Sequence, residues 1–597
     1  MNNLVREDAT ASVKRQDGER PSAYPAEWKV EFGPATPLPE GYQVGRETTR
    51  LEAGTVFIPG GKPLPCDVVW EHDIPVTLRD GVVIYTDVLR PADQDKDLPA
   101  IVNWSPYGKS LPGFPAVPWG VPTENFSGLG KFEGADAAFW LDHGYALVNP
   151  DARGVGKSGG DIHFWGSVES NDGYDVVEWA AEQSWSSGKV AFYGASWLAM
   201  SQWGIAATKP PHLAAIAPWN GMYDIYRSHM LWGGIPDPGF FDFVPFMVPG
   251  DTSSIERIGD MSLREPLLNE YWEDKTPDLS DVTVPAYVVM DGITGLHSFG
   301  ASEAFRRLGS ENKWFRINNT HEWNDQYTLY YQEDVLRFFD RYLKDIDNGW
   351  EETPRVRACI INAGGEDFVD VPYTQWPVNE TRYNELYLDA GTESLSTAPP
   401  ADVSSVSYPG VDGAATFTIK FDQDTTLLGY MSARLWVEAQ DAEDMDLFLL
   451  VEKLDADGNL LAPHREFADA YPVSPPGAPG RLRVSLRELD AELSTDFVPV
   501  QAFRRHQKLA PGQIVPVDIG LTPRSYFVEA GQQLRLTVAG YNVRGTGVDA
   551  HALTDKALLG ARLSAETPRA ENSGNHIIHT GPGYLSYLKV PVVENPR

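Results

Sequence analysis

The chain has 597 residues, of which 42% are hydrophobic and 22% charged, a composition typical of a folded globular protein. Acidic side chains outnumber basic ones by 84 to 49, and the formal net charge of −35 disfavours contact with the phosphate backbone of nucleic acid. No run of residues approaches the roughly 18 apolar positions of a membrane helix. We therefore expect neither nucleic acid nor a membrane as a partner, and the length predicts two or three domains.

The cysteine content also limits the possibilities. Only Cys66 and Cys359 are present, so we expect no disulfide framework and no cysteine metal site. Two cysteines fit a reducing compartment, and the polar N-terminus lacks the apolar segment of a signal peptide, which together predict a cytoplasmic location. No metal or organic cofactor is expected. The sequence leaves open whether the chain forms a homo-oligomer.

The first strand candidates follow a long N-terminal stretch without a regular apolar pattern. Residues 1–65 are rich in Pro, Gly, Glu and Arg with weak periodicity, which predicts an irregular N-terminal arm. From Val76 onward, two strand-like runs flank Asp80-Gly81, a dipeptide that favours tight turns. This pattern predicts a hairpin at the start of a sheet.

Short apolar runs then alternate with helical patterns, which predicts an α/β domain with a parallel sheet. The helical pattern over 175–182 follows Asn171 and Asp172, which we expect to cap that helix at its N-terminus. The α/β catalytic domain is expected to cover residues 66–220 and 281–353. Its strand candidates are residues 100–103, 145–149, 190–193 and 284–290.

Two further regions differ from this domain in composition and in the pattern of apolar residues. Residues 221–280 are rich in aromatic residues and proline and interrupt the alternation, which predicts an inserted cap. Residues 354–597 contain short alternating runs separated by Gly and Pro turns, which is typical of a β-sandwich or jelly roll. No internal repeat is evident.

Ser196 is the candidate nucleophile. A strand is followed by Gly194, Ala195 and Ser196 and then by a helix of small residues, which is the form of a nucleophile elbow. The glycine usually found two places after the serine is replaced by Leu198. A serine hydroxyl attacks a carbonyl group only when a base takes its proton. The sequence must therefore also supply a histidine.

Elbow enzymes place the acid and then the histidine later in the chain than the serine. His321 lies just past a strand candidate and before the last helix of the domain, where a triad base is expected. Asp291 directly follows another strand and is the candidate acid, whereas Glu322 and Asp325 are expected to be solvated. His297 is interpreted as a structural residue at a helix start, with a place in the substrate pocket as the alternative.

Several motifs in order resemble hydrolases related to cocaine esterase and X-prolyl dipeptidyl aminopeptidase, the CocE/NonD family. The resemblance covers nearly the whole chain from about residue 70. The motifs are Leu78–Val82, Ser105–Lys109, Asp151–Ser158, Trp185–Val190, Tyr193–Trp197, Asn575–His579 and Tyr584–Pro591. The resemblance implies an α/β-hydrolase domain with an inserted helical cap (221–280) and a C-terminal β jelly-roll domain (354–597).

The same resemblance implies roles for three residues. Ser196 matches the family's nucleophile, and Tyr107 matches the tyrosine whose hydroxyl donates to the oxyanion. The backbone N–H of Trp197 is then the second donor. Tyr107 could instead be a packed aromatic residue in a turn after Pro106.

The chain departs from the family at the acid and the base. Family members commonly carry an aspartate three or four residues beyond the strand, where this chain has Ile293 or Thr294. Asp291 could serve only if this loop is rearranged. His321 is also shifted by about one place relative to the family's usual Trp-Ser-His sequence.

The sequence thus predicts a serine esterase or amidase that forms an acyl-Ser196 intermediate on a small-molecule ester or amide. The aromatic cap favours a bulky or aromatic acyl group, and the alternative is plain packing. An X-prolyl or amino-acyl peptidase is a second possibility, and a binding protein with a decayed triad is a third. The cap candidates for substrate binding are Tyr226, Trp232, Phe240, Phe241 and Phe246.

Overall fold

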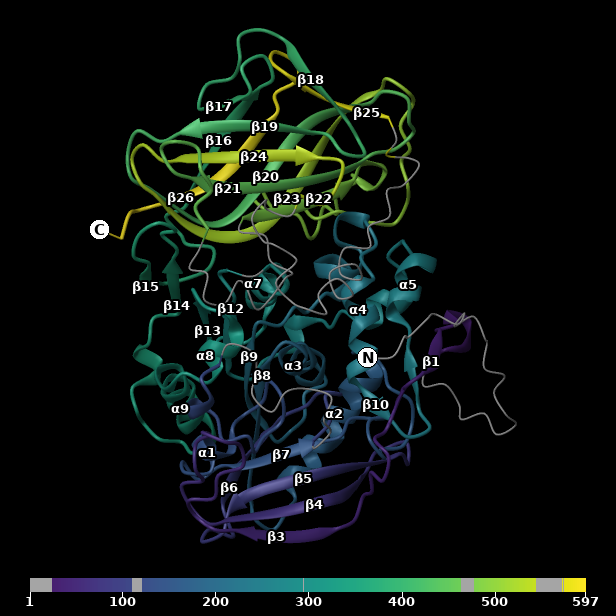
Figure 1. Cartoon of the computed structure of the whole chain (residues 1–597), viewed down its shortest axis with the longest axis vertical. Coiled ribbons are helices and arrows are strands. Elements are labelled where there is room, and N and C mark those ends of the chain that lie inside the picture. The colour runs from purple at the N-terminus through teal and green to yellow at the C-terminus, as the bar shows by residue number, and fades with distance from the viewer. Residues whose placement is uncertain are drawn as a thin grey trace.

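The computed structural model describes residues 24–109, 121–293, 295–462, 477–543, 572 and 574–596. Figure 1 shows a β-rich unit stacked on an α/β unit, with short helices at the side of their junction. Within the described residues, no helix is both long and apolar enough to cross a membrane. Tyr24–Trp28 and the short strands β1 (Phe32–Pro34) and β2 (Thr36–Pro37) run along the surface of the molecule.

The α/β unit is built on one eleven-stranded sheet in the order β15-β14-β13-β12-β9-β8-β6-β7-β5-β4-β3. Strands from β14 to β7 are parallel where they pair, whereas the β3, β4, β5 edge and β15 are antiparallel. The central strands are fully buried and apolar, as strands covered on both faces must be. The strands are β3 (Glu47–Leu51), β4 (Val68–Thr77), β5 (Val83–Pro91), β6 (Leu98–Val102), β7 (Ala146–Pro150), β8 (Ser186–Ala195), β9 (Leu213–Trp219), β12 (Ala286–Met290), β13 (Lys313–Ile317), β14 (Val356–Ile360) and β15 (Phe368–Tyr373).

Helices cover both faces of this sheet. One core joins it to α2 (Gly166–Ala181), α3 (Trp197–Ala207) and α7 (Ser298–Arg307). A second core joins the opposite face to α1 (Ala137–Trp140) and α9 (Leu329–Leu343). The predicted α/β class is therefore confirmed, and so is the hairpin, because β4 and β5 flank Asp80-Gly81.

Three sequence-based boundaries differ from the structure. The expected arm over 1–65 contains β3, whose pairing with β4 extends the sheet. The expected domain end at 353 falls before β14, which pairs with β13, and before β15, which pairs with β14, so both strands belong to this sheet. Helix α2 begins at Gly166 rather than beside Asp172, because the Asp172 carboxylate lies 2.6 Å from the guanidinium of Arg153 and does not cap a helix.

The chain between β9 and β12 forms a set of short helices beside the sheet edge. These are a π-helical turn η3 (Tyr226–Met230), η4 (Trp232–Gly234), α4 (Gly239–Phe243), η5 (Val244–Met247), α5 (Ile258–Arg264), α6 (Glu270–Asp274) and η6 (Leu279–Asp281). Two short strands in the same segment, β10 (Pro249–Gly250) and β11 (Ser254–Glu256), pair with β2 and β1. This is the segment where the sequence predicts a helical cap.

The C-terminal unit is a β-sheet that closes on itself, because β26 pairs with both β16 and β20. Alternating buried residues fill its interior, which forms a separate hydrophobic core. The β-rich domain predicted from the sequence is confirmed as a closed barrel, and its jelly-roll connectivity stays a prediction. The strands are β16 (Arg382–Asp389), β17 (Ser394–Ser396), β18 (Ser404–Pro409), β19 (Ala414–Lys420), β20 (Thr425–Ala439), β21 (Asp446–Leu454), β22 (Ala478–Arg483), β23 (Ile514–Val528), β24 (Gln533–Ala539), β25 (Asn575–Thr580) and β26 (Tyr587–Val593).

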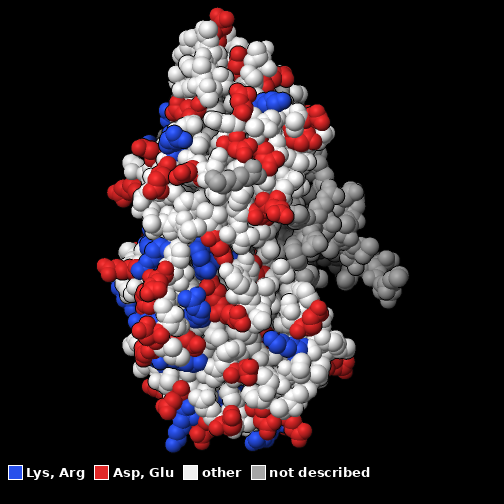
Figure 2. All heavy atoms as spheres, turned by 90° about the vertical axis from the view of Figure 1, so that its left-hand side faces the viewer, with Lys and Arg blue, Asp and Glu red and all other residues white. Residues whose placement is uncertain are grey.

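The surface charge is distributed over the molecule. On the face in Figure 2, acidic side chains lie scattered from the barrel at the top to the α/β unit below, with most of the basic side chains over the lower part. The net charge of −35 is thus not gathered into one patch on this face. Spread acidic charge of this kind favours solubility rather than one charged binding site.

Candidate active site

Ser196 lies in the turn between β8 and α3, in a strained backbone conformation. Its φ of 54° and ψ of −120° fall outside the regions that a residue with a side chain normally occupies. Gly194 has a φ of 147°, and a Cβ atom there would lie 2.6 Å from the Cβ atom of Leu198. Leu198 therefore replaces the usual second glycine by occupying the space that Gly194 leaves open. The structure confirms the strand–turn–helix geometry of the predicted elbow.

Tyr107 lies beside this turn, on the loop that follows β6. Its ring is mostly buried and makes edge-to-face contacts with the rings of Trp197, at 6.1 Å between centroids, and Phe132, at 5.5 Å. The structure thus brings Tyr107 next to the residue that follows Ser196. Tyr107 is packed, as the alternative interpretation requires, and it is packed against the elbow.

Buried lysines fix the loop that carries Tyr107. The Lys131 ammonium donates to the carbonyl oxygens of Ser105 and Pro150, each at 2.6 Å, and burial lowers its pKa to about 7. The backbone N–H of Lys109 donates to the Asp151 carboxylate at 2.7 Å. Because these bonds hold the loop on both sides of Tyr107, the ring has a fixed position relative to the sheet edge.

His321 follows β13 and caps α8 (Glu322–Gln326). Its Nδ1 atom accepts a hydrogen bond from the backbone N–H of Trp323 at 3.3 Å, and the two rings are 4.5 Å apart. In the neutral ring this contact places the proton on Nε2. His321 is 3% exposed, and burial lowers its pKa to about 3. The imidazole is therefore neutral at physiological pH.

A chain of contacts connects His321 to the elbow. The Trp323 indole donates to the Glu133 carboxylate at 2.7 Å, and the Glu133 carbonyl oxygen accepts from the backbone N–H of Ala195 at 3.1 Å. Ala195 directly precedes Ser196. The predicted base thus lies at the same edge of the sheet as the predicted nucleophile, as the carboxyl ends of neighbouring parallel strands require.

Glu322 lies beside His321, and the carboxyl groups of Asp291 and Glu133 lie near Glu322. Asp291 is fully buried after β12, and its carboxylate accepts from the backbone N–H of Ile293 at 2.7 Å. Burial raises the pKa of Glu322 well above its usual range, and repulsion from Asp291 and then Glu133 adds to the rise. The Glu322 Oε2 atom lies 3.9 Å from His321 Nε2. Asp291 and Glu322 are thus neighbours, and Glu322 faces the imidazole.

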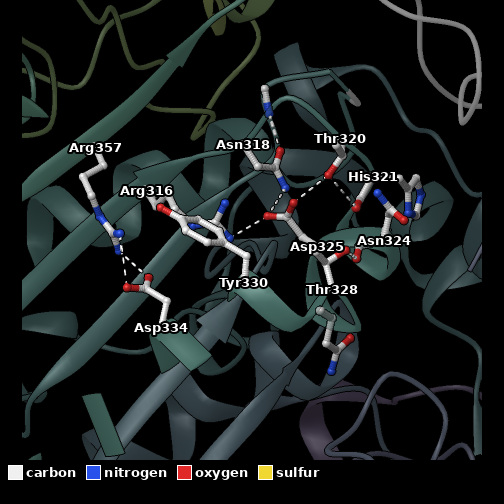
Figure 3. Close-up of polar contacts among 12 residues, drawn as sticks. Arg316, Asn318, Thr320, His321, Asn324, Asp325, Thr328, Tyr330, Asp334 and Arg357 are labelled. Carbon is white, nitrogen blue, oxygen red and sulfur yellow. Dashed lines mark hydrogen bonds and ion pairs between the residues drawn. The ribbon is translucent and has the colours of Figure 1, made fainter. Parts of the chain in front are cut away.

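The expectation that Glu322 and Asp325 are solvated is wrong. Their exposures are 2% and 0%, because α8 turns both carboxyl groups toward the protein interior. Asp325 receives hydrogen bonds from Thr320 at 2.6 Å and Asn318 at 3.2 Å, and it pairs with Arg316 (Figure 3). Asp325 therefore fixes the loop that positions His321.

His297 lies at the start of α7, as the structural interpretation predicts, but its side chain makes no capping bond. It is buried, and the pKa falls to about 3 through burial and then through the neighbouring His229 and His321. His297 is therefore close to the site that contains His321, which also agrees with the alternative of a pocket residue. Both interpretations remain predictions.

The cap aromatics expected to bind substrate have different surroundings. Tyr226 is fully buried, donates its hydroxyl to Pro266 and packs on Trp272 and Phe503, which agrees with plain packing. Trp232 lines a cavity of about 80 Å³ between the cap and the barrel, over the guanidinium of Arg481. The remaining aromatics are Phe240 and Phe241, which pack on each other and on His229, and Phe246, whose side chain lies outside the described residues.

Sequence reasoning missed Glu133, Lys131 and Glu169 as buried charged residues around the site. None of them lies in a motif with recognisable catalytic spacing. Glu169 also has polar neighbours in sequence, such as Ser167 and Ser170, so its place on the buried face of α2 is seen only in the structure. Among the described residues, no three His, Cys, Asp or Glu side chains form a group that could hold a metal ion.

Comparison with known proteins agrees with this geometry. Residues 80–262 match the family model "X-Pro dipeptidyl-peptidase (S15 family)", and residues 348–589 match "X-Pro dipeptidyl-peptidase C-terminal non-catalytic domain". A cocaine esterase from Rhodococcus sp. (strain MB1 Bresler) is 25% identical over 58% of this chain and 66% of its own length. A putative Xaa-Pro dipeptidyl-peptidase from Rhodopirellula baltica is 21% identical over 67% of this chain and 68% of its own length.

The similarity to solved structures covers more of the chain than the similarity to these two relatives. A CocE/NonD family hydrolase from Staphylococcus aureus has a TM-score of 0.82 and 31% identity, covering 93% of this chain and 98% of that one. An α-amino acid ester hydrolase has a TM-score of 0.64 at 16% identity over 90% of this chain and 98% of its own, which concerns the fold alone. The fold and the elbow define a serine hydrolase. The chain belongs to the CocE/NonD family.

The raised pKa of Glu133 predicts a pH effect on stability. Burial raises this pKa to about 8, against a hydrogen bond from Trp323 that lowers it, so the folded protein holds a proton that the unfolded chain releases near pH 4.5. Stability from this group is therefore lost as the pH rises from about 4.5 to about 8, by at most about 1.4 kcal/mol per pH unit. Glu133→Gln removes this loss.

The measurement is thermal unfolding of the wild type and Glu133→Gln between pH 5 and pH 8. The variant should gain in melting temperature relative to the wild type as the pH rises. The exposed Glu182→Gln in α2's C-terminal turn is the control and should show a constant difference. A constant difference for Glu133→Gln as well would contradict the prediction.

Proposed function

We propose that the protein hydrolyses carboxylic esters or amides through an acyl-Ser196 intermediate. The observation that carries this proposal is the strained backbone of Ser196 at the end of β8, which presents its hydroxyl at the sheet edge beside Tyr107. A strained serine in this position is typical of nucleophiles, because the strain persists only where the surrounding structure holds it.

In the first half of the reaction, Ser196 Oγ attacks the substrate carbonyl carbon while His321 accepts the hydroxyl proton. The carbonyl oxygen becomes an oxyanion, which accepts hydrogen bonds from the Tyr107 hydroxyl and the Trp197 backbone N–H. The carbon–oxygen or carbon–nitrogen bond to the leaving group then breaks. The imidazolium of His321 gives its proton to the departing alcohol or amine.

In the second half, water attacks the acyl-enzyme and His321 takes one of its protons. Collapse of the second tetrahedral intermediate releases the carboxylic acid and returns the proton to Ser196 Oγ. His321 acts through Nε2 only when its ring proton is on Nδ1, so the long capping bond from Trp323 must be given up first. A carboxylate near Nδ1 favours that tautomer.

We propose that Asp291 supplies this carboxylate at Nδ1 and that Glu322 is its buried neighbour on the Nε2 side of the ring. Two buried carboxyl groups in contact do not both ionise readily, so the pair shares a proton and carries a single negative charge. The support is the burial of both groups and the raised pKa of Glu322 beside Asp291. Glu322 itself lies by Nε2, with its Oε2 atom 3.9 Å from that nitrogen.

Two classes of substrate are compatible with the proposed reaction. The relatives are named as an esterase of cocaine and as X-Pro peptidases, so esters with a bulky acyl group and amides of X-Pro peptides are both candidates. Trp232 and its cavity between the cap and the barrel favour a bulky acyl group.

We also propose a cytoplasmic location for the protein, and the two free cysteines support it.

Replacement of Ser196 tests the central proposal. Ser196→Ala should lower kcat on a p-nitrophenyl ester by about 10³-fold or more and abolish labelling by a fluorophosphonate probe. The exposed Ser187→Ala serves as the control and should keep wild-type activity and labelling. Unchanged turnover in Ser196→Ala would contradict the proposal and favour a binding protein. A parallel series of X-Pro p-nitroanilides distinguishes esterase from peptidase.

The oxyanion role of Tyr107 has a separate test. Tyr107→Phe keeps the ring that packs on Trp197 but removes the hydroxyl, so kcat should fall by about 10²-fold with little change in KM. Tyr85→Phe, at a position in β5 away from the loop, is the matched control. If kcat of Tyr107→Phe stays within about twofold of the wild type, the residue is only a packed aromatic.

The acid pair is tested by amide replacements of similar shape. Asp291→Asn should lower kcat by about 10³-fold or more because the remaining Glu322 lies on the wrong side of the imidazole to hold the required tautomer. Glu322→Gln should lower kcat by only about tenfold. The larger loss in Glu322→Gln would assign the acid to Glu322, and no loss in either variant would exclude the pair.

A further inference from the structure

A single buried carboxylate connects the two segments that carry the proposed oxyanion donors. Glu169 lies in the first turn of α2 and is 6% exposed. Its Oε1 atom accepts hydrogen bonds from the indole N–H of Trp104 at 2.8 Å and from that of Trp197 at 2.9 Å. One carboxylate oxygen has two lone pairs, so both bonds can form at once.

The two indoles belong to the two halves of the oxyanion site. Trp104 is three residues before Tyr107 on the loop after β6, and Trp197 is the residue whose own backbone N–H is the second donor. Trp197 also begins α3 directly after Ser196. A shift of the Glu169 oxygen therefore moves both donor segments.

The other carboxylate oxygen is fixed as well. Glu169 Oε2 accepts from the backbone N–H of Trp165 at 2.8 Å, and Trp165 itself has a φ of 54° where α2 begins. The rings of Trp165 and Trp197 lie 4.3 Å apart. Burial raises the pKa of Glu169 to about 7, while the bonds from Trp197, Trp104 and Trp165 lower it. The carboxylate is thus held by three N–H donors in an apolar surrounding.

We propose that Glu169 is a positioning residue that sets the distance between the Tyr107 hydroxyl and the Trp197 backbone N–H. The inference rests on the proposed function, since it assumes that these two groups bind the oxyanion. Donors to an oxyanion act by being fixed before the charge develops. A carboxylate that joins their two segments provides this, because each segment comes from a different strand. Apart from packing, the two segments are also joined by a long bond from Ser201 Oγ to the Trp104 carbonyl oxygen, at 3.4 Å.

A structural role alone would affect stability, so the test separates stability from transition-state binding. Glu169→Gln keeps the shape, but its amide N–H₂ faces either the backbone N–H of Trp165 or both indole N–H groups. One or two of the three donors then lose their acceptor, and the facing N–H groups displace the side chain. We expect kcat on a p-nitrophenyl ester to fall by at least about tenfold while KM changes by less than about threefold. Affinity for phenylboronic acid, which forms a tetrahedral adduct with the serine, should fall by the same factor as kcat/KM.

Asp136→Asn is the matched control. Asp136 is 1% exposed and also accepts from three donors, the backbone N–H and hydroxyl of Ser127 and the backbone N–H of Ala138. Burial raises its pKa to about 6, so the two carboxyl groups have similar surroundings. None of its partners carries an oxyanion donor. This variant should lose thermal stability to a similar degree and keep kcat and boronate affinity within about twofold.

If Glu169→Gln does not fold, Trp197→Phe gives the same information, since it removes one indole donor and keeps an aromatic ring and the backbone N–H. It should lower kcat and boronate affinity together by about fivefold or more. Wild-type values of kcat and boronate affinity in the folded variant would overturn the inference. If the wild type neither depends on Ser196 nor binds the boronate, the proposed function fails instead.

Discussion

The backbone of Ser196 is the constraint on which the rest of the site depends. A non-glycine residue with a φ of 54° and a ψ of −120° is less stable by about 1–3 kcal/mol than one in an ordinary conformation, and the surrounding structure must hold it. The buried C-terminal part of β8 enters the turn and α3 leaves it, and the Ser196 N–H donates to carbonyl oxygens at the end of β9. Gly194 is needed there because Leu198 fills the space of its missing side chain.

Buried ionisable groups surround this turn, and hydrogen bonds within the protein take the place of solvent around them. Lys131 fixes the loop with Tyr107, and Glu169 links that loop to Trp197. Glu133 links the end of β8 to the segment with His321. A buried charge without partners is strongly destabilising. Lys131 and Glu169 accordingly have several hydrogen-bond partners, whereas Glu133, whose Oε2 atom has none, keeps its proton. A polar network of this kind fixes relative positions that apolar packing alone leaves free to shift.

The acid and base are the least regular part of the site. The aspartate expected from the family is absent at its usual place. Glu322 lies beside His321 instead, with Asp291 and Glu133 near Glu322. Glu322 and Asp325 lie in the same short helix, α8, yet their side chains have different neighbours. Glu322 faces the imidazole, whereas Asp325 pairs with Arg316. Their burial comes from the direction in which α8 packs on the sheet, and neither composition nor periodicity contains that information.

The sequence by itself determined the α/β class, the hairpin at Asp80-Gly81, the elbow at Ser196 and the β-rich C-terminal region. These features depend on periodicity, turn residues and glycine, which act over a few neighbouring residues. Only the tertiary structure decided that β14 and β15 complete the first sheet, that the barrel closes through β26, and which carboxyl groups approach His321. It also brought Trp104, Glu169 and Trp197 to one oxygen atom. These contacts join residues that are far apart in the chain, so their partners follow from how helices and strands pack and from no local pattern.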